Sequence, residues 1–237
     1  MDGSTLKTKK MGDFNHHIKH IISRKSFDVE IGNAIEYFIN TLDSLNIQYI
    51  VMGSTGIQTY LEYFHRLPND LDILLQEDDI LKIVKICDSD ANLTFEYNEV
   101  ASKVVYKNKF YLHLVPNKMN IIDKIENVIF TKINVYHLDR TIYRNINLIN
   151  FSKSIAVRVP ILEYMFCLNM LVRLDTNNFS DNISILEKYN LNDTYIKEFT
   201  VRVPEMNEVL KNRVEELRNK LSIIRKDLLD KLPCITS

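Results

Sequence analysis

The spacing of hydrophobic residues changes along the chain and predicts a series of helices and strands. In GNAIEYFINTLDSLNI the apolar residues recur at three- and four-residue steps, which predicts a helix with one buried face. QYIVMGS then predicts a strand that ends at Gly53, and NDLDILL predicts a second strand of alternating character. A helical pattern over residues 55–63 lies between them. Another helix, DDILKIVKICDS, and three strands, NLTFEYNE, KVVYKN and KFYLHLVP, follow. This order predicts a small mixed α/β unit.

Beyond Pro116 the pattern changes from short strand-like runs to helices. The runs lie in ENVIFTKINVYHL and INLINFSKSIAVRVP, and helices follow from Pro160. SDNISILEKYN predicts one helix with Ser180 as its N-cap, and the last helix, 204–231, is predicted to begin at Pro204. We therefore expect an α/β (α+β) fold, a mixed sheet with flanking helices followed by a C-terminal helical domain. The expected boundaries are a polar arm over 1–26, the α/β domain over 27–153 and the helical domain over 154–237.

The last predicted helix carries a heptad-like apolar stripe. Its members alternate in steps of four and three: Leu210, Val214, Leu217, Leu221, Ile224 and Leu228. The stripe either packs within the protein's own helices or serves a protein partner or self-association through helix 204–231. It spans fewer than four heptads, which favours packing within the chain.

Composition and charge narrow the classes of function. Hydrophobic residues make up 46% of the 237 residues and charged residues 26%, as in ordinary globular proteins. The formal net charge of −1 argues against a protein that coats nucleic acid, because such proteins carry a basic excess. No apolar run reaches the ~20 residues that a membrane-spanning helix needs, so no membrane association is expected. The three cysteines are far apart and show no metal-binding spacing, which favours a reducing, cytoplasmic location.

The N-terminal arm is polar and basic and lacks the apolar stretch of a secretory signal. It groups His16, His17 and His20. These histidines either form a metal-binding or anion-binding group or belong to a solvated tail, and the polar character of the arm favours the tail.

The residues that carry chemistry lie between positions 49 and 75. Gly53 and Ser54 stand where a strand ends and a helix begins, and free backbone N–H groups at such a turn attract phosphate. Ser54 adds a hydroxyl that either binds an anion or caps the helix. Asp70 and Asp72 are two apart in a strand, so both carboxylates point to the same face. Two neighbouring carboxylates favour a cation, and Mg²⁺ accepts one or two of them together with phosphate oxygens.

This stretch resembles the signature of the DNA-polymerase-β-like nucleotidyltransferase superfamily, in particular its lincosamide, aminoglycoside, toxin-type and minimal branches. The matching residues are Gly53, Ser54, Arg66, Asp70 and Asp72. The resemblance implies a nucleotidyltransferase domain over 27–153 and Mg²⁺-dependent transfer of a nucleoside monophosphate from an NTP to a hydroxyl. It further implies Asp70 and Asp72 as metal ligands, at one or two ions, and Gly53, Ser54 and Arg66 as nucleotide-binding residues.

The sequence departs from that family at two places. The family's third carboxylate corresponds to His113, which would serve as a base but would hold Mg²⁺ poorly. A lysine that contacts the triphosphate in toxin-type members corresponds to Asn169, with Arg173 one turn further on as the expected nucleotide-binding cation. Asp181 corresponds to the carboxylate that begins the next helix. Its alternative role is a helix-start residue that faces the helix dipole.

Three readings of the function follow. The first is an active nucleotidyltransferase whose acceptor is a small molecule or a protein more readily than RNA, because the net charge is near zero. The second is a protein of this fold that has lost catalysis, as His113 and Asn169 suggest, and acts as a binding or scaffold module. The third is an accidental motif, which a structure without a strand–Gly-Ser–helix turn facing the Asp70 and Asp72 strand would establish.

Overall fold

The computed structural model describes residues 27–61, 68, 70–97, 102–107, 110–116, 120–125, 129–134, 145–150, 156–171, 176–202, 204 and 207–235. The predicted N-terminal arm lies outside the described residues, and so do Arg66 and Arg173. The structure therefore does not bear on these three predictions.

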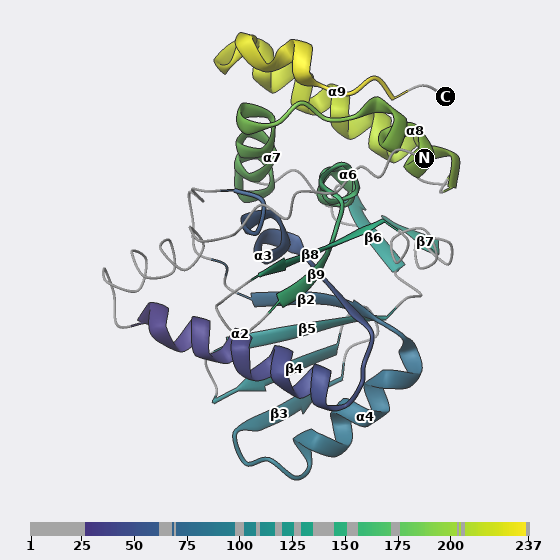
Figure 1. Ribbon diagram of the computed structural model, residues 1–237. Coiled ribbons are helices and arrows are strands. Elements are labelled where there is room, and N and C mark those ends of the chain that lie inside the picture. Colours follow the sequence, from purple (N-terminus) through teal and green to yellow (C-terminus); the bar gives the residue numbers. More distant parts are fainter. Residues whose placement is uncertain are drawn as a thin grey trace, which may run out of the picture.

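The first part of the described chain is the predicted mixed α/β unit (Figure 1). Its elements follow the order expected from the hydrophobic spacing: α2 (Phe27–Ser44), β1 (Tyr49–Met52), α3 (Gly53–Gln58), β2 (Asp70–Leu75), α4 (Glu77–Cys87), β3 (Leu93–Glu96), β4 (Ser102–Tyr106) and β5 (Phe110–Pro116). The helix predicted over 55–63 is shorter than expected and begins two residues earlier, at Gly53.

The strands of this unit form one mixed five-stranded sheet in the order β1-β2-β5-β4-β3. β1 pairs with β2 antiparallel, and β2 pairs with β5 in parallel. β5 with β4 and β4 with β3 are antiparallel. This order puts β2, the strand with the two aspartates, between the strand that ends at Gly53 and the strand that contains His113.

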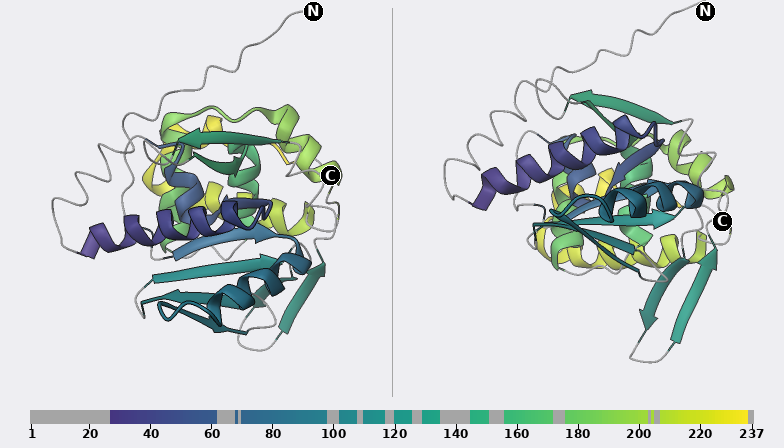
Figure 2. Two further views of the ribbon diagram at one scale, coloured as in Figure 1. Left: turned by 60° about the horizontal axis from the view of Figure 1, so that its bottom comes forward. Right: turned by 90° about the horizontal axis from the view of Figure 1, so that it is seen from below.

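One face of the sheet is closed by α2 and α4. Both helices lie across the same side of the strands, and α2 runs along the sheet in both views of Figure 2. The apolar core beneath them takes alternate residues of each strand together with the buried faces of the two helices. Its members include Ile35, Phe38, Ile39, Leu42, Val51, Leu71, Ile73, Leu75, Ile83, Leu112 and Leu114. The apolar residues that recur at three- and four-residue steps in α2 form the helix side of this core.

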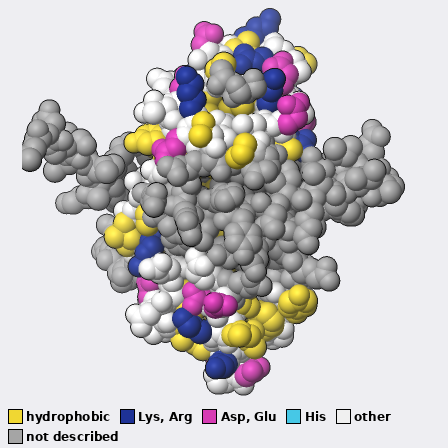
Figure 3. All heavy atoms as spheres, turned by 90° about the vertical axis from the view of Figure 1, so that its right-hand side faces the viewer, with side chains coloured by type: hydrophobic (Ala, Val, Ile, Leu, Met, Phe, Trp, Pro, Cys, Tyr) yellow, Lys and Arg dark blue, Asp and Glu magenta, His cyan; other side chains and the backbone are white. Residues whose placement is uncertain are grey.

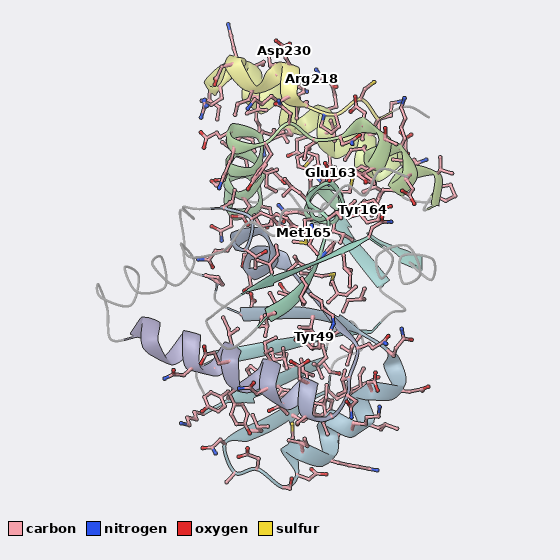
Figure 4. All side chains as sticks on the ribbon, in the orientation of Figure 1. Tyr49, Glu163, Tyr164, Met165, Arg218 and Asp230 are labelled. Atoms are coloured by element: carbon pink, nitrogen blue, oxygen red, sulfur yellow. The ribbon has the colours of Figure 1, made fainter. Side chains whose placement is uncertain are left out.

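The second part of the chain is helical and gathers at the end of the molecule opposite α4 and β3 (Figure 1). Its helices are α6 (Leu162–Leu171), α7 (Thr176–Lys188), α8 (Asp193–Arg202) and α9 (Asn207–Ile224), followed by the 3₁₀-helix η2 (Lys226–Lys231). Every residue of α6 except Glu163 is buried, which fits its nearly uniform apolar sequence. Tyr164 and Met165 of this helix lie at the junction with the α/β unit (Figure 4).

A second apolar core joins these helices to the sheet. It contains most of α6 and the inner residues of α7, α8 and α9, together with Ile50, Met52 and Leu74 from β1 and β2. Met52 and Leu74 therefore face away from the core beneath α2 and α4. The division of the chain into domains at residue 153 stays a prediction, and this core contains residues from both sides of it.

Two helix boundaries differ from those predicted. The helix expected to start at a Ser180 cap begins at Thr176, and the helix expected over 204–231 consists of α9 and η2. Four stripe residues of α9, Leu210, Val214, Leu217 and Leu221, are buried in the second core, as is Leu228 of η2. These five stripe residues therefore pack inside the protein's own helices and offer no surface to a partner, whereas the sixth, Ile224, is 56% exposed.

After Pro116 the chain forms two antiparallel hairpins, and β7, β8 and β9 fall within the predicted strand-like runs whereas β6 does not. One pairs β6 (Asn120–Ile125) with β7 (Ile129–Asn134), and the other pairs β8 (Ile146–Asn150) with β9 (Ala156–Pro160). The β6–β7 hairpin extends away from the five-stranded sheet (Figure 2). The β8–β9 hairpin lies beside β1, and Val157 and Val159 of β9 belong to the core beneath α2 and α4. This position brings the start of α6 next to the sheet.

Candidate functional site

The turn between β1 and α3 has the backbone geometry that the glycine in it allows. Gly53 is the first residue of α3 and has a φ of 61°, in the left-handed region that residues with a side chain rarely adopt. Met52 is the N-cap, and no side chain caps the helix. Ser54, which the sequence offered as a cap, instead lies in the first helical turn and is buried.

Asp72 lies directly against this turn. In the β1–β2 pairing it is the partner of Met52, so its side chain is next to the residue that follows β1. A Cβ atom on Gly53 would overlap with Oδ2 of Asp72 and would lie 3.1 Å from Cγ. Gly53 is thus required twice, for its backbone conformation and for the space that the carboxylate occupies. The strand–Gly-Ser–helix turn faces the aspartate strand, which is the arrangement that an accidental motif would lack.

Asp70 is fixed to the same helix through its backbone. The hydroxyl of Thr55, a buried residue in the first turn of α3, donates a hydrogen bond of 3.0 Å to the carbonyl oxygen of Asp70. Along β2 the residues alternate, with Asp70 and Asp72 half-buried and Leu71 and Ile73 buried on the other face. The two carboxylates therefore share the face next to α3, as the two-residue spacing predicts.

A second glycine, Gly56, allows α3 to pack closely against the helical part. A Cβ atom on Gly56 would lie 2.8 Å from Cε of Met165 on α6 and 3.0 Å from the carbonyl oxygen of Val51. The sequence interpretation named neither Gly56 nor Thr55 as site residues. The signal available was the string GSTG, in which two glycines three apart allow close packing on neighbouring sides of one helical turn.

His113 occupies the strand next to the aspartates. Its backbone pairs with Asp72 on one side and with Lys103 on the other. Its side chain lies outside what the structure describes, as do the whole of Arg66 and Arg173. The structure thus brings together Gly53, Ser54, Asp70 and Asp72 and puts the His113 backbone beside them.

Asn169 is used in packing between α6 and α7. Its side-chain nitrogen donates to Oδ1 of Asn182 at 3.1 Å and to the carbonyl oxygen of Asn178 at 3.3 Å. Asp181 is 1% exposed and lies inside α7, which begins at Thr176. The expectation that Asp181 begins its helix is therefore wrong, and with it the reading as a carboxylate that faces the helix dipole.

The donor set at the turn fits magnesium rather than a softer metal. Among the described residues, no group of three or more His, Cys, Asp and Glu side chains is assembled as a metal site. Mg²⁺ does not need such a group, because it is usually held by one or two carboxylates and completes its shell with water and phosphate oxygens. The half-buried pair of Asp70 and Asp72 meets that requirement.

Comparison with known proteins identifies the fold. Over 86% of this chain and 94% of that chain, the structure is similar to a nucleotidyltransferase-like protein from Paracoccidioides brasiliensis, with 16% identity and a TM-score of 0.56. A lincosamide antibiotic adenylyltransferase bound to lincomycin matches 63% of this chain and 92% of its own, at 14% identity and a TM-score of 0.46. The antibiotic-resistance factor ANT(2'')-Ia matches 83% and 95%, at 10% identity and a TM-score of 0.41.

No protein-family model and no curated protein matches the chain. The first of the three structures shows that the chain has a nucleotidyltransferase-like fold, which confirms the fold that the motif at residues 49 to 75 predicts. In the described part of the chain, none of the helices combines the length and apolar character needed to cross a bilayer.

Proposed function

We propose that the protein is a Mg²⁺-dependent nucleotidyltransferase that moves a nucleoside monophosphate from an NTP to a hydroxyl acceptor. The observation that carries the proposal is the contact between the Asp72 carboxylate and Gly53, with Thr55 bonded to the backbone of Asp70. A carboxylate pair and a glycine turn that we propose binds phosphate thus lie side by side on a nucleotidyltransferase-like fold. Nucleotidyl transfer requires both, because the triphosphate must be held next to the cation that neutralises it.

Each residue of the turn has a role in this proposal. Asp70 and Asp72 hold Mg²⁺, at one ion or two, which supplies positive charge to the phosphate oxygens during transfer. The backbone N–H groups after Gly53 and the Ser54 hydroxyl bind the phosphates, and Arg66 and Arg173 neutralise the triphosphate.

The proposed reaction forms one bond and breaks one. The acceptor oxygen bonds to the α-phosphorus, and the bond from that phosphorus to the bridging oxygen of the β-phosphate breaks, so pyrophosphate leaves. The acceptor proton passes to an imidazole nitrogen of His113, whose ordinary pKa near 6.5 suits a base at neutral pH.

The acceptor is more readily a small molecule or a protein than RNA. The formal net charge is −1. On the face shown in Figure 3, Lys and Arg side chains alternate with Asp and Glu among the described residues, and they form no continuous basic surface. An enzyme that tracks an RNA backbone would present such a surface.

Calorimetric titration with each NTP in the presence of Mg²⁺ tests the proposal. We expect the protein to bind at least one NTP, and the Asp70→Asn/Asp72→Asn double variant to lose that binding. Asp78→Asn/Asp88→Asn is the matched control, because it removes two negative charges from exposed positions on and just after α4. The control should bind nucleotide as the unchanged protein does.

A different outcome would favour the second candidate, a binding or scaffold module that keeps the fold without catalysis. Its supporting observation is Asn169, whose side-chain amide is committed to Asn178 and Asn182 where a lysine is expected. Absence of binding to every NTP, or equal binding by the aspartate variant, would support this candidate over the enzyme. For either candidate we propose a cytoplasmic location, supported by three cysteines that are all free thiols.

A further inference from the structure

Tyr60 joins the end of α3 to two later segments of the chain through its hydroxyl. It lies in the turn after α3, and its own backbone N–H donates to the carbonyl oxygen of Ile57 at 3.0 Å. Its hydroxyl donates to the carbonyl oxygen of Pro160, the last residue of β9, at 2.5 Å. The same hydroxyl accepts a hydrogen bond of 2.8 Å from Nδ2 of Asn147 on β8. Both hydroxyl bonds therefore tie α3 to the β8–β9 hairpin.

The backbone carbonyl of Tyr60 is held by two residues at the end of α7. The hydroxyl of Tyr189 donates to it at 2.5 Å, and Nζ of Lys188 donates at 3.4 Å. The ammonium group of Lys188 also lies 5.4 Å from the centre of the Tyr189 ring. The helical part of the chain thus contacts the same residue that the hairpin holds.

These contacts complete a set of attachments along the whole of α3. At its first residue the helix meets Asp72, and one turn on Gly56 packs on Met165. Thr55 is bonded to the backbone of Asp70. Tyr60 fixes the other end, and burial raises the pKa of its hydroxyl above the ordinary value, so the group stays protonated and able to donate. Figure 1 shows α3 between the sheet and α7, and α3 contacts β2, α6 and α7.

We propose that Tyr60 is a positioning residue that sets the location of the turn at Gly53 and Ser54 relative to the β8–β9 hairpin and the helical part of the chain. α3 has only six residues, so a displacement of its end reaches its first turn. The position of α6 and α7 thereby determines how the phosphate-binding groups face Asp70 and Asp72. The consequence for nucleotide binding rests on the proposed function, whereas the positioning of α3 does not.

Hydrogen exchange without nucleotide tests the positioning directly. Tyr60→Phe keeps the ring and removes both hydroxyl bonds, and Tyr189→Phe removes a bond to the Tyr60 carbonyl from the other side. In both variants we expect the amides of residues 57–61 to exchange about tenfold faster, since each variant loses at least one part-buried hydrogen bond at Tyr60. Tyr195→Phe, at a more exposed tyrosine on α8, is the control and should leave these amides unchanged. Unchanged exchange in both variants would overturn the inference whether or not the protein binds nucleotide.

Nucleotide affinity separates positioning from a merely structural role. Val214→Ala on α9 lowers the stability of the second core but takes no part in the hydrogen bonds at Tyr60. The two variants are compared under conditions in which their melting temperatures are lowered equally. There Tyr60→Phe should weaken Mg²⁺–NTP binding about tenfold, and Val214→Ala should leave it unchanged. Equal affinity in the two variants would contradict the positioning role. If the unchanged protein binds no NTP, the proposed function fails and the exchange result alone decides the inference.

Discussion

The two faces of β2 differ in the residues they carry and in their surroundings. On one face Leu71, Ile73 and Leu75 are buried beneath α2 and α4 in a continuous apolar core. On the other, Asp70 and Asp72 are half-buried next to the turn of α3. Both faces belong to one strand, so a shift of its register by one residue would put apolar side chains in place of the carboxylates. Burial of the apolar face therefore fixes the direction of the two carboxylates. It also supplies the stability that offsets the repulsion between Asp70 and Asp72.

The largest expected difference comes from changing neighbouring residues on the two faces. Leu71→Ala should lower the free energy of unfolding by about 2–5 kcal/mol, because it leaves a cavity in the core. Its nucleotide affinity per folded molecule should not change. Asp72→Asn should keep the stability, since it removes one of two neighbouring negative charges, and should weaken Mg²⁺–NTP binding by about 10- to 100-fold.

Chemical denaturation and calorimetry of the two variants measure these effects side by side. The comparison would be refuted if Asp72→Asn destabilised the fold as much as Leu71→Ala, or if Leu71→Ala weakened nucleotide binding while folded.

A smaller difference is expected within α3. Gly53→Ala introduces both a left-handed alanine, which costs about 1–2 kcal/mol, and a clash with the Asp72 carboxylate. Gly56→Ala meets the flexible end of Met165 and the carbonyl of Val51, so it should lower stability by about 1–3 kcal/mol as an overpacked site. Nucleotide binding should weaken in Gly53→Ala, by less than in Asp72→Asn, and should not weaken in Gly56→Ala, measured at protein concentrations where both variants are folded. Equal loss of binding in both would place the sensitive feature in α3 as a whole and not at Asp72.

The smallest effect is expected on the sheet face covered by α2 and α4. There Tyr37 of α2 stacks on Tyr106 with ring centres 4.8 Å apart, and its hydroxyl donates to Asp90. That bond holds the pKa of Asp90 below its usual value, and burial together with Asp90 raises the pKa of Tyr37 to about 12.

The sign of each shift gives a pH dependence of stability. The lowered carboxyl pKa contributes stability at neutral pH that is lost as pH falls through the folded-state pKa of Asp90. The raised tyrosine pKa contributes stability that is lost as pH rises from about 10 toward 12. Tyr37→Phe should flatten both limbs of a plot of unfolding free energy against pH and leave nucleotide binding unchanged. A variant with the same two limbs as the unchanged protein would show that the bond contributes nothing.

The sequence predicts much of the α/β part because its signals are local. The apolar spacing of α2 and the two-residue spacing of Asp70 and Asp72 each follow from a few consecutive residues, and the structure has both features. What the sequence could not supply was the partner of each side chain. Met52 meets Asp72 through strand pairing, and Gly56 meets Met165 from a helix more than a hundred positions away.

The same limitation explains the errors in the helical part. The polar run at Ser180, Asp181 and Asn182 is typical of a helix start, so the sequence predicts a cap there. In the structure Asn182 is buried inside α7 and bonded to Asn169 of α6. Its polarity is satisfied by a distant amide, which no local pattern reveals.

The contact between Gly53 and Asp72 also limits how a chain of this shape can change through mutation. A larger residue at position 53 would overlap with the Asp72 carboxylate, so the side chain at position 72 must then move or become shorter. We therefore expect the two positions to change together during evolution. Where a protein of this fold has a bulkier residue in place of Gly53, we therefore expect a displaced second strand or a different residue in place of Asp72.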